Sequence, residues 1–156
     1  MLPFLLSTMR QCILFVGIQA SGKTTFFRTF LAETHVHVSM DVLGTRRREK
    51  DLVAECIGKH ASFVVDDTNL TRDVRSMFLA PARDAGYRVT GLFFRSVIAE
   101  SAARNSLREG RERIPSHVIA ASSNKLELPS IEEGFDELWY VSIVGNGWNV
   151  SEWRTE

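Results

Sequence analysis

The stretch Gly17-Ile18-Gln19-Ala20-Ser21-Gly22-Lys23-Thr24 decides the fold class of this chain. It fits the pattern G-x-x-x-x-G-K-[ST], which is typical of loops that bind the phosphates of a nucleoside triphosphate. The apolar run 12–16 before it predicts a strand, and residues 23–33 predict a helix. A strand, this loop and a helix in that order are the context in which the motif binds phosphate. The sequence therefore predicts a P-loop protein that binds a nucleoside triphosphate.

The residue types in this loop predict how it would hold the nucleotide. The glycines let the backbone follow the anion closely and turn its N–H groups inward, and the helix N-terminus adds partial positive charge. Lys23 is predicted to reach the β- and γ-phosphates and to act in catalysis, and Thr24 to ligate Mg²⁺. The alternative interpretation is a Gly/Ser turn before a helix that binds nothing, and such a turn would not require Lys-Thr directly after the second glycine. The predicted nucleotide-binding residues of the loop are Gly17, Gln19, Ala20, Ser21, Gly22, Lys23, Thr24 and Thr25.

The composition fits one compact domain over residues 1–156, since 44% hydrophobic residues suffice for an ordinary core. The net charge is zero, which gives no support for attraction of the whole molecule to nucleic acid or to a membrane. Arginine outnumbers lysine by 15 to 4, and arginine suits bidentate phosphate contacts, although arginine richness alone can reflect genomic composition.

Cellular location is also indicated by the sequence. Cys12 and Cys56 lack metal-like or disulfide-like spacing, which indicates free thiols in a reducing compartment. No apolar run approaches the roughly 20 residues that span a bilayer. The opening residues lack a signal-peptide pattern. We therefore expect a cytoplasmic protein, with residues 1–9 as an extension and 145–156 as a loose tail.

Strand-like and helix-like segments alternate along the chain. Strands are predicted at 11–17, 35–39, 62–66, 87–94 and 137–143, and helices at 23–33, 48–59, 71–86, 97–109 and 114–126. Pro81 is expected to kink or split its helix. This rhythm predicts an α/β, P-loop NTPase-type three-layer sandwich. Its five-stranded parallel sheet would have the order 2-3-1-4-5, helices on both faces and a short Arg-rich lid.

Asp41 follows the second predicted strand, so it should lie at the same sheet edge as the phosphate loop. A carboxylate there could accept the proton of an attacking hydroxyl group or align that group with the γ-phosphoryl group. It would then be a catalytic and acceptor-binding residue. A helix cap or a surface acid is the alternative interpretation.

The third predicted strand ends in Asp66-Asp67-Thr68-Asn69. An acid at this place is the usual outer partner of Mg²⁺ in a P-loop protein. Because side chains alternate along a strand, the spacing leaves open whether Asp66 or Asp67 serves the metal. An Asx-turn into the next helix would account for the other acid.

Arg104, Arg108 and Arg111 recur at helical spacing and would share one face if their helix extends that far. Such a face would fit a lid that clamps the phosphates, with Arg108 catalytic and both Arg104 and Arg108 binding the nucleotide. A solvated charged face, partly compensated by Glu109 and Glu112, is the alternative.

A second basic run begins at Arg46-Arg47, shortly after Asp41. Either it contacts a phosphate on the acceptor, or it is a solvated turn before a helix. His35 and His37 share a strand face, but nothing marks a third ligand, so a structural role is favoured over metal binding.

These elements together resemble a known family. The loop 17–24, Asp41, residues 65–70, the run 104–108 with Ile114-Pro115, and residues 128–135 are similar to the kinase domain of polynucleotide 5′-hydroxyl kinases. The phosphate loop alone is shared by a very large class of proteins. The Asp-Thr-Asn and Arg-Asn-x-x-Arg elements in this order are far more specific.

The resemblance implies an ATP-dependent transfer of the γ-phosphate to the 5′-hydroxyl of a polynucleotide, with Mg²⁺. It implies that Asp41 matches the general base, Arg108 the lid arginine at the β–γ bridge and Arg104 a further lid arginine. Gly44 stands where one member of that family carries an arginine that contacts a nucleic-acid phosphate, and Arg46 and Arg47 lie close by. The acceptor therefore stays open, with a sugar, nucleoside, nucleotide-sugar or antibiotic as the alternative.

Two other classes of protein fit the sequence less well. A GTPase would need Asp-x-x-Gly after the third strand, and the guanine-like motif at 124–127 falls inside a predicted helix. A nucleotide-binding module without activity would need neither Asp41 nor Arg108.

Overall fold

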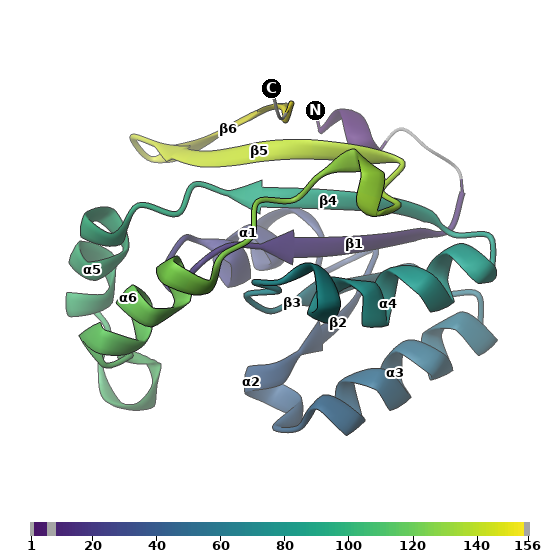
Figure 1. Ribbon diagram of the computed structural model, residues 1–156, viewed down its shortest axis with the longest axis horizontal. Coiled ribbons are helices and arrows are strands. Elements are labelled where there is room, and N and C mark those ends of the chain that lie inside the picture. Colours follow the sequence, from purple (N-terminus) through teal and green to yellow (C-terminus); the bar gives the residue numbers. More distant parts are fainter. Residues whose placement is uncertain (1, 6–8, 155–156) are drawn as a thin grey trace.

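The computed structural model describes residues 2–5 and 9–154, and it has an α/β fold built on one sheet (Figure 1). The strands are β1 Gln11–Val16, β2 Val36–Ser39, β3 Phe63–Asp66, β4 Arg88–Phe94, β5 Glu137–Val144 and β6 Gly147–Glu152. The α-helices are α1 Lys23–Phe30, α2 Met40–Leu43, α3 Arg46–Gly58, α4 Arg72–Asp84, α5 Ile98–Ser106 and α6 Ser116–Lys125. Short 3₁₀ helices are η1 Pro3–Leu5, η2 Gly110–Glu112 and η3 Ile131–Glu133.

The strand order β2-β3-β1-β4-β5 is the predicted one, and all of these neighbours pair in parallel. The apolar strand β1 is buried along its whole length, as its central place requires. Leu14 pairs with Val65 of β3 on one side and with Gly91 of β4 on the other. The predicted fold class and strand order are therefore confirmed.

The C-terminal segment corrects one expectation. Residues 147–152, predicted within a loose tail, form β6, which pairs antiparallel with β5 and makes the sheet six-stranded. Gly145 has φ 59°, as the first central residue of a tight turn that joins two antiparallel strands often does. Residues 155–156 of that predicted tail lie outside the described residues.

Successive side chains of a strand point to opposite faces of the sheet. Because both sets are apolar here, helices cover both faces. Cys12 and Leu14 of β1 belong to the core under α3 and α4. Ile13 and Phe15 belong to the core under α1. Three phenylalanines and a tryptophan make edge-to-face pairs in the core under α1, among them Phe15–Phe94 at 4.9 Å.

The ends and breaks of some elements differ from the prediction. Helix α4 runs unbroken across Pro81, so the chain is not split there. In the predicted extension, Phe4 of η1 is buried, and its carbonyl accepts a 2.8 Å hydrogen bond from Gln11 Nε2. Residues 1 and 6–8 of that extension lie outside the described residues. Among the described helices, none has both the length and the apolar character needed to cross a membrane.

Candidate active site

The phosphate loop joins β1 to α1 at the carboxyl edge of the sheet. Its first amide, that of Gly17, donates to Thr68 O, and that of Ile18 donates to Ser96 Oγ. Gly22 directly precedes α1 with φ 98°, and a Cβ on it would lie 2.7 Å from Trp148 Cη2. Glycine is therefore required there by both its backbone conformation and the close approach of the indole. The first two residues of the loop are thus anchored to the segments that follow β3 and β4.

Lys23 begins α1 and turns its side chain back under the loop. Its ammonium group donates to Gly17 O at 2.9 Å, Ile18 O at 2.6 Å and Ser21 Oγ at 3.3 Å. Burial lowers the pKa of Lys23 to about 8, and Asp66 and Asp67 oppose that shift. A buried ammonium bonded mostly to carbonyl oxygens is placed to meet an anion in the loop.

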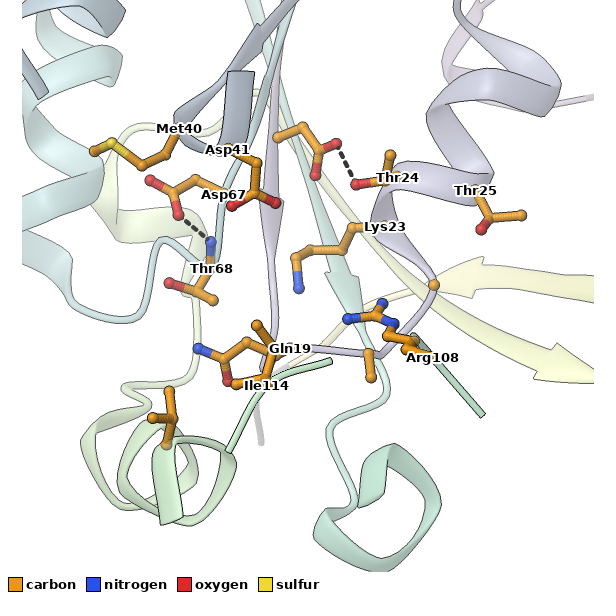
Figure 2. A pocket seen from close by; sticks show the side chains of 14 residues that line it. Gln19, Lys23, Thr24, Thr25, Met40, Asp41, Asp67, Thr68, Arg108 and Ile114 are labelled. Carbon is orange, nitrogen blue, oxygen red and sulfur yellow. Dashed lines mark hydrogen bonds between the residues drawn. The ribbon is translucent and has the colours of Figure 1, made fainter. Parts of the chain in front are cut away.

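A cleft of about 240 Å³ opens beside Lys23 (Figure 2). The residues that line it come from five separate parts of the chain. They are Gln19, Ala20, Gly22, Lys23, Thr24, Thr25, Met40, Asp41, Asp66, Asp67, Thr68, Arg108, Ile114 and Val118. The cleft lies at the carboxyl ends of β1, β2 and β3, where a parallel sheet places its ligands.

The two acids at the end of β3 point to different partners. Asp66 Oδ2 accepts hydrogen bonds from Thr24 Oγ1 at 2.8 Å and from His37 Nε2 at 2.7 Å. Asp67 Oδ2 instead accepts from Arg46, and its Oδ1 accepts from the Thr68 amide. Thr24 and Asp66 together offer hydroxyl and carboxylate oxygens, the donor set that Mg²⁺ prefers, so the residues present fit this ion.

Asp41 lies in the first turn of α2, exposed, and lines the cleft on the side of β2 (Figure 2). The N-cap position of this helix belongs to Ser39, so Asp41 is not the cap. Asp41 and Lys23 thus border one cleft from different elements.

Arg46, at the start of α3, is bonded to acids on both sides. Its Nη1 donates to Glu49 Oε1 at 2.6 Å and to Asp67 Oδ2 at 3.0 Å. Glu49 is fully buried, and burial, with a further contribution from Asp67, raises its pKa to about 7, while Arg46 opposes the shift. Arg46 therefore reaches the cleft border through Asp67, whereas Arg47 is exposed and outside the cleft lining.

The predicted arginine face is wrong in part. Helix α5 ends at Ser106, so Arg108 follows it and Arg111 lies exposed in η2. Arg104 Nε donates to Ala20 O at 2.6 Å, which ties α5 to the phosphate loop. Arg108 lines the cleft itself.

A second hollow adjoins the cleft on the other side of the loop. It shares Ala20, Gly22, Thr25 and Arg108 with the cleft. Its remaining lining residues are Arg104 and the β5–β6 hairpin residues Ile143, Gly145, Asn146, Gly147 and Trp148.

Some residues at the site were not among the predicted ones. Met40, Thr68, Ile114 and Val118 line the cleft, and His37 contacts Asp66. Met40, Ile114 and Val118 could not be predicted as site residues, because in a sequence an apolar residue that lines a cleft cannot be distinguished from one in the core. Period-two alternation could have found His37, since it placed this side chain on one face of β2.

The comparisons with known proteins agree with this geometry. Residues 12–129, three quarters of the chain, match the family described as an AAA domain. The chain belongs to the AAA-domain family. That membership implies that the P-loop of this AAA domain binds a nucleoside triphosphate.

The relatives of this AAA domain are distant. The bifunctional polynucleotide phosphatase/kinase of Schizosaccharomyces pombe is 24% identical over 132 residues, which cover 81% of this chain and 32% of the relative. The chain thus spans about a third of that relative's length. Kti12 of Chaetomium thermophilum, solved with ADP-AlF3, has a TM-score of 0.68 at 16% identity and covers 84% of this chain and 88% of its own. A gluconokinase of Sinorhizobium meliloti 1021 has a TM-score of 0.61 at 18% identity, over 89% and 86%. The two structures are similar to this chain in fold.

Proposed function

We propose that this protein is an ATP-dependent kinase that moves the γ-phosphoryl group to a hydroxyl group of its acceptor. One observation carries the proposal: a single cleft brings Lys23, Asp41 and Arg108 together with the Thr24–Asp66 pair. Binding of a nucleotide alone would not require both a carboxylate and a guanidinium at the border of the same cleft.

The nucleotide would lie with its phosphates in the loop. The amides of residues 19–25 and the ammonium of Lys23 would neutralise the β- and γ-phosphates, and Arg108 would approach from the lid. The adjoining hollow, lined by Arg104 and Trp148, would take the nucleoside. These groups stabilise charge that moves onto the bridging oxygen as the terminal phosphate leaves.

Thr24 and Asp66 would hold Mg²⁺, which when bound neutralises charge on the phosphates. Asp67 would not bind the metal. It would instead hold Arg46 in place, because it accepts a hydrogen bond from Arg46 and none from Thr24. We therefore propose different tasks for the two acids that spacing left equivalent.

Asp41 would accept the proton of the attacking hydroxyl group. The acceptor oxygen forms a bond to the γ-phosphorus, the bond from that phosphorus to the β–γ bridging oxygen breaks, and ADP leaves. Because Asp41 is on α2 and the phosphates would lie in the loop, acceptor and nucleotide would contact different walls of the cleft.

For the acceptor we propose the 5′-hydroxyl of a polynucleotide. The Asp-Thr-Asn and Arg-Asn-x-x-Arg elements support it, as does the likeness to the yeast polynucleotide phosphatase/kinase. One observation favours a small neutral acceptor instead: Arg46, which would meet an acceptor phosphate, is already bonded to Glu49 and Asp67. The carboxylate of Asp67 beside this guanidinium, joined by that of Glu49 above about pH 7, reduces its attraction for another anion.

Transfer of radiolabelled γ-phosphate from ATP with Mg²⁺ tests the proposal. We expect label on a 5′-hydroxyl oligonucleotide, none on the same oligonucleotide with a 5′-phosphate, and little with Asp41→Asn. Label on a sugar or nucleoside while oligonucleotides stay inert would establish the small-molecule kinase. No transfer to any member of a broad hydroxyl panel, with ATP still bound, would contradict a kinase.

A further inference from the structure

We propose that His37 is a positioning residue that holds Asp66 for the metal, an inference that rests on the proposed Mg²⁺ role of Thr24 and Asp66. His37 Nε2 lies 2.7 Å from Asp66 Oδ2, and the Asp66 side chain is only 2% exposed. Because an ionised carboxylate only accepts, His37 Nε2 carries the proton and donates it. The same oxygen accepts from Thr24 Oγ1 at 2.8 Å.

The place of His37 follows from strand pairing. Ser39 of β2 pairs with Asp66 of β3, and His37 lies two residues earlier on the same face. That face is covered by α1, whose Phe27 ring stacks on the imidazole at 4.0 Å between centroids and 13° between planes. The ring plane is therefore fixed by packing before any metal binds.

Two donors on Oδ2 have a consequence for Oδ1. Together they fix the rotation of the carboxylate, and among the described residues none donates to Oδ1. Asp66 borders the cleft, so Oδ1 is its free acceptor for the metal or for water bound to the metal. Outer partners of this kind orient metal ligands, and their loss typically lowers metal affinity about 10- to 100-fold.

Three variants separate the hydrogen bond from the ring. His37→Phe keeps an aromatic ring on Phe27 and removes the donor, whereas His37→Gln keeps a donor near the Nε2 position and removes the ring. His35→Phe is the matched control, because His35 bonds Gln11 and Thr34 and does not contact Asp66.

The readout is binding of Mn²⁺, used as the probe metal and followed by its electron paramagnetic resonance signal, with a non-hydrolysable ATP analogue present. We expect His37→Phe to weaken Mn²⁺ binding about tenfold or more. Binding of the same analogue without metal should be unchanged in every variant. His37→Gln should recover most of the affinity, and His35→Phe should match the unaltered protein.

Equal Mn²⁺ affinity in His37→Phe and the unaltered protein would overturn the inference. A loss of metal-free analogue binding in His37→Phe would also overturn it, since that indicates a role in shaping the loop. If His37→Phe does not fold, His37→Asn, whose amide is too short to reach Oδ2, is measured with the same expectation. An unaltered protein that binds the analogue but no Mn²⁺ would instead refute the proposed metal site.

Discussion

Arg46 donates a hydrogen bond of 3.0 Å to Asp67, and this contact joins the start of α3 to the end of β3. Arg47, the next residue, is exposed and lies outside the cleft lining. Two arginines that the sequence presents as a pair are thus in different environments, one fixed at the border of the cleft and one in solvent.

The first prediction uses this difference to test the acceptor. An oligonucleotide acceptor should show a KM that rises steeply with added salt, because its phosphates release counterions on binding. Arg46→Ala should reduce the slope of log KM against log salt by about 1, and Arg47→Ala by less. Arg28→Ala, an exposed change on α1, serves as the control. A salt-independent KM would exclude a polynucleotide contact at Arg46.

The second prediction concerns Asp41. Asp41→Asn should leave ATP affinity unchanged, because the carboxylate borders the cleft from α2, away from the phosphate loop. The rate constant for transfer should fall by roughly 10²-fold or more, the usual scale for loss of a general base. Single-turnover transfer and nucleotide binding would be measured beside Asp51→Asn, an exposed acid on α3. Collapse of ATP binding with turnover intact would place Asp41 at the nucleotide.

The third prediction concerns Lys23. Lys23→Ala should abolish transfer, because the ammonium that would neutralise the β- and γ-phosphates is lost, an effect on the order of 3 kcal/mol or more. Lys59→Ala removes a lysine that is paired with Glu55 on the protein surface and should have no effect on the rate. Initial rates at saturating ATP measure both. Turnover close to normal in Lys23→Ala would show that the loop lysine is not catalytic.

The fourth prediction follows from the pKa of Lys23, which burial lowers to about 8. Above that pH the nucleotide-free protein has a neutral Lys23, whereas bound phosphates favour the ammonium form. Binding must then take up a proton, so nucleotide affinity should be constant below pH 8 and fall as pH rises above it. Calorimetric titration at pH 9 in two buffers of different ionisation enthalpy should show uptake approaching about one proton, and at pH 6.5 almost none. Equal heats in both buffers at pH 9 would contradict the prediction.

The fifth prediction concerns Glu49, whose pKa is raised from 4.5 to about 7, first by burial and then by Asp67. Between these values the folded protein keeps a proton that the unfolded chain has lost. Stability is therefore lost as pH rises through this window, and the full cost remains above pH 7. Glu49→Gln keeps an acceptor for Arg46 and lacks this titration. From pH 5 to pH 8 the unfolding free energy of the unaltered protein should fall by an extra amount on the order of 2 kcal/mol, measured in urea. If the unfolding free energies of the unaltered protein and of Glu49→Gln change in parallel from pH 5 to pH 8, Glu49 does not titrate in this range and the prediction is contradicted.

Much of the fold was predictable because the signals were local and repeated. Each of the five predicted strands begins and ends within one residue of its prediction, since apolar runs bounded by turn residues mark strands clearly. The sheet edge then brings Lys23, Asp41 and Asp66 together, because parallel strands all end at that edge.

The parts that the sequence did not predict depend on pairing or on tertiary contacts. Gly145-Asn146 was interpreted as the start of a loose tail, yet a glycine followed by asparagine also suits the two-residue turn of a hairpin, which it forms here. The helix with Arg104 was predicted too long, because its residues up to Glu109 have good helix propensity. Arg46 contacts Asp67, 21 residues away, and His37 contacts Asp66, 29 residues away. Only strand register or the packing of α3 brings these pairs together.

Residues near the start and near the end of the described chain both pack beside β5, on opposite faces of the sheet. Phe4 packs against Trp139 with ring centroids 6.2 Å apart, and the Trp153 amide donates to Leu138 O at 3.0 Å. Because β6 runs antiparallel to β5, the chain returns to the amino edge of the sheet, the edge at which η1 also packs. Figure 1 shows β6 running back along β5 toward the side of the sheet where the chain starts. A covalent link between the two ends at this edge would cross neither the cleft nor the phosphate loop. This chain is therefore suited to circular permutation, in which the order of the elements along the chain changes while their order in the sheet is kept.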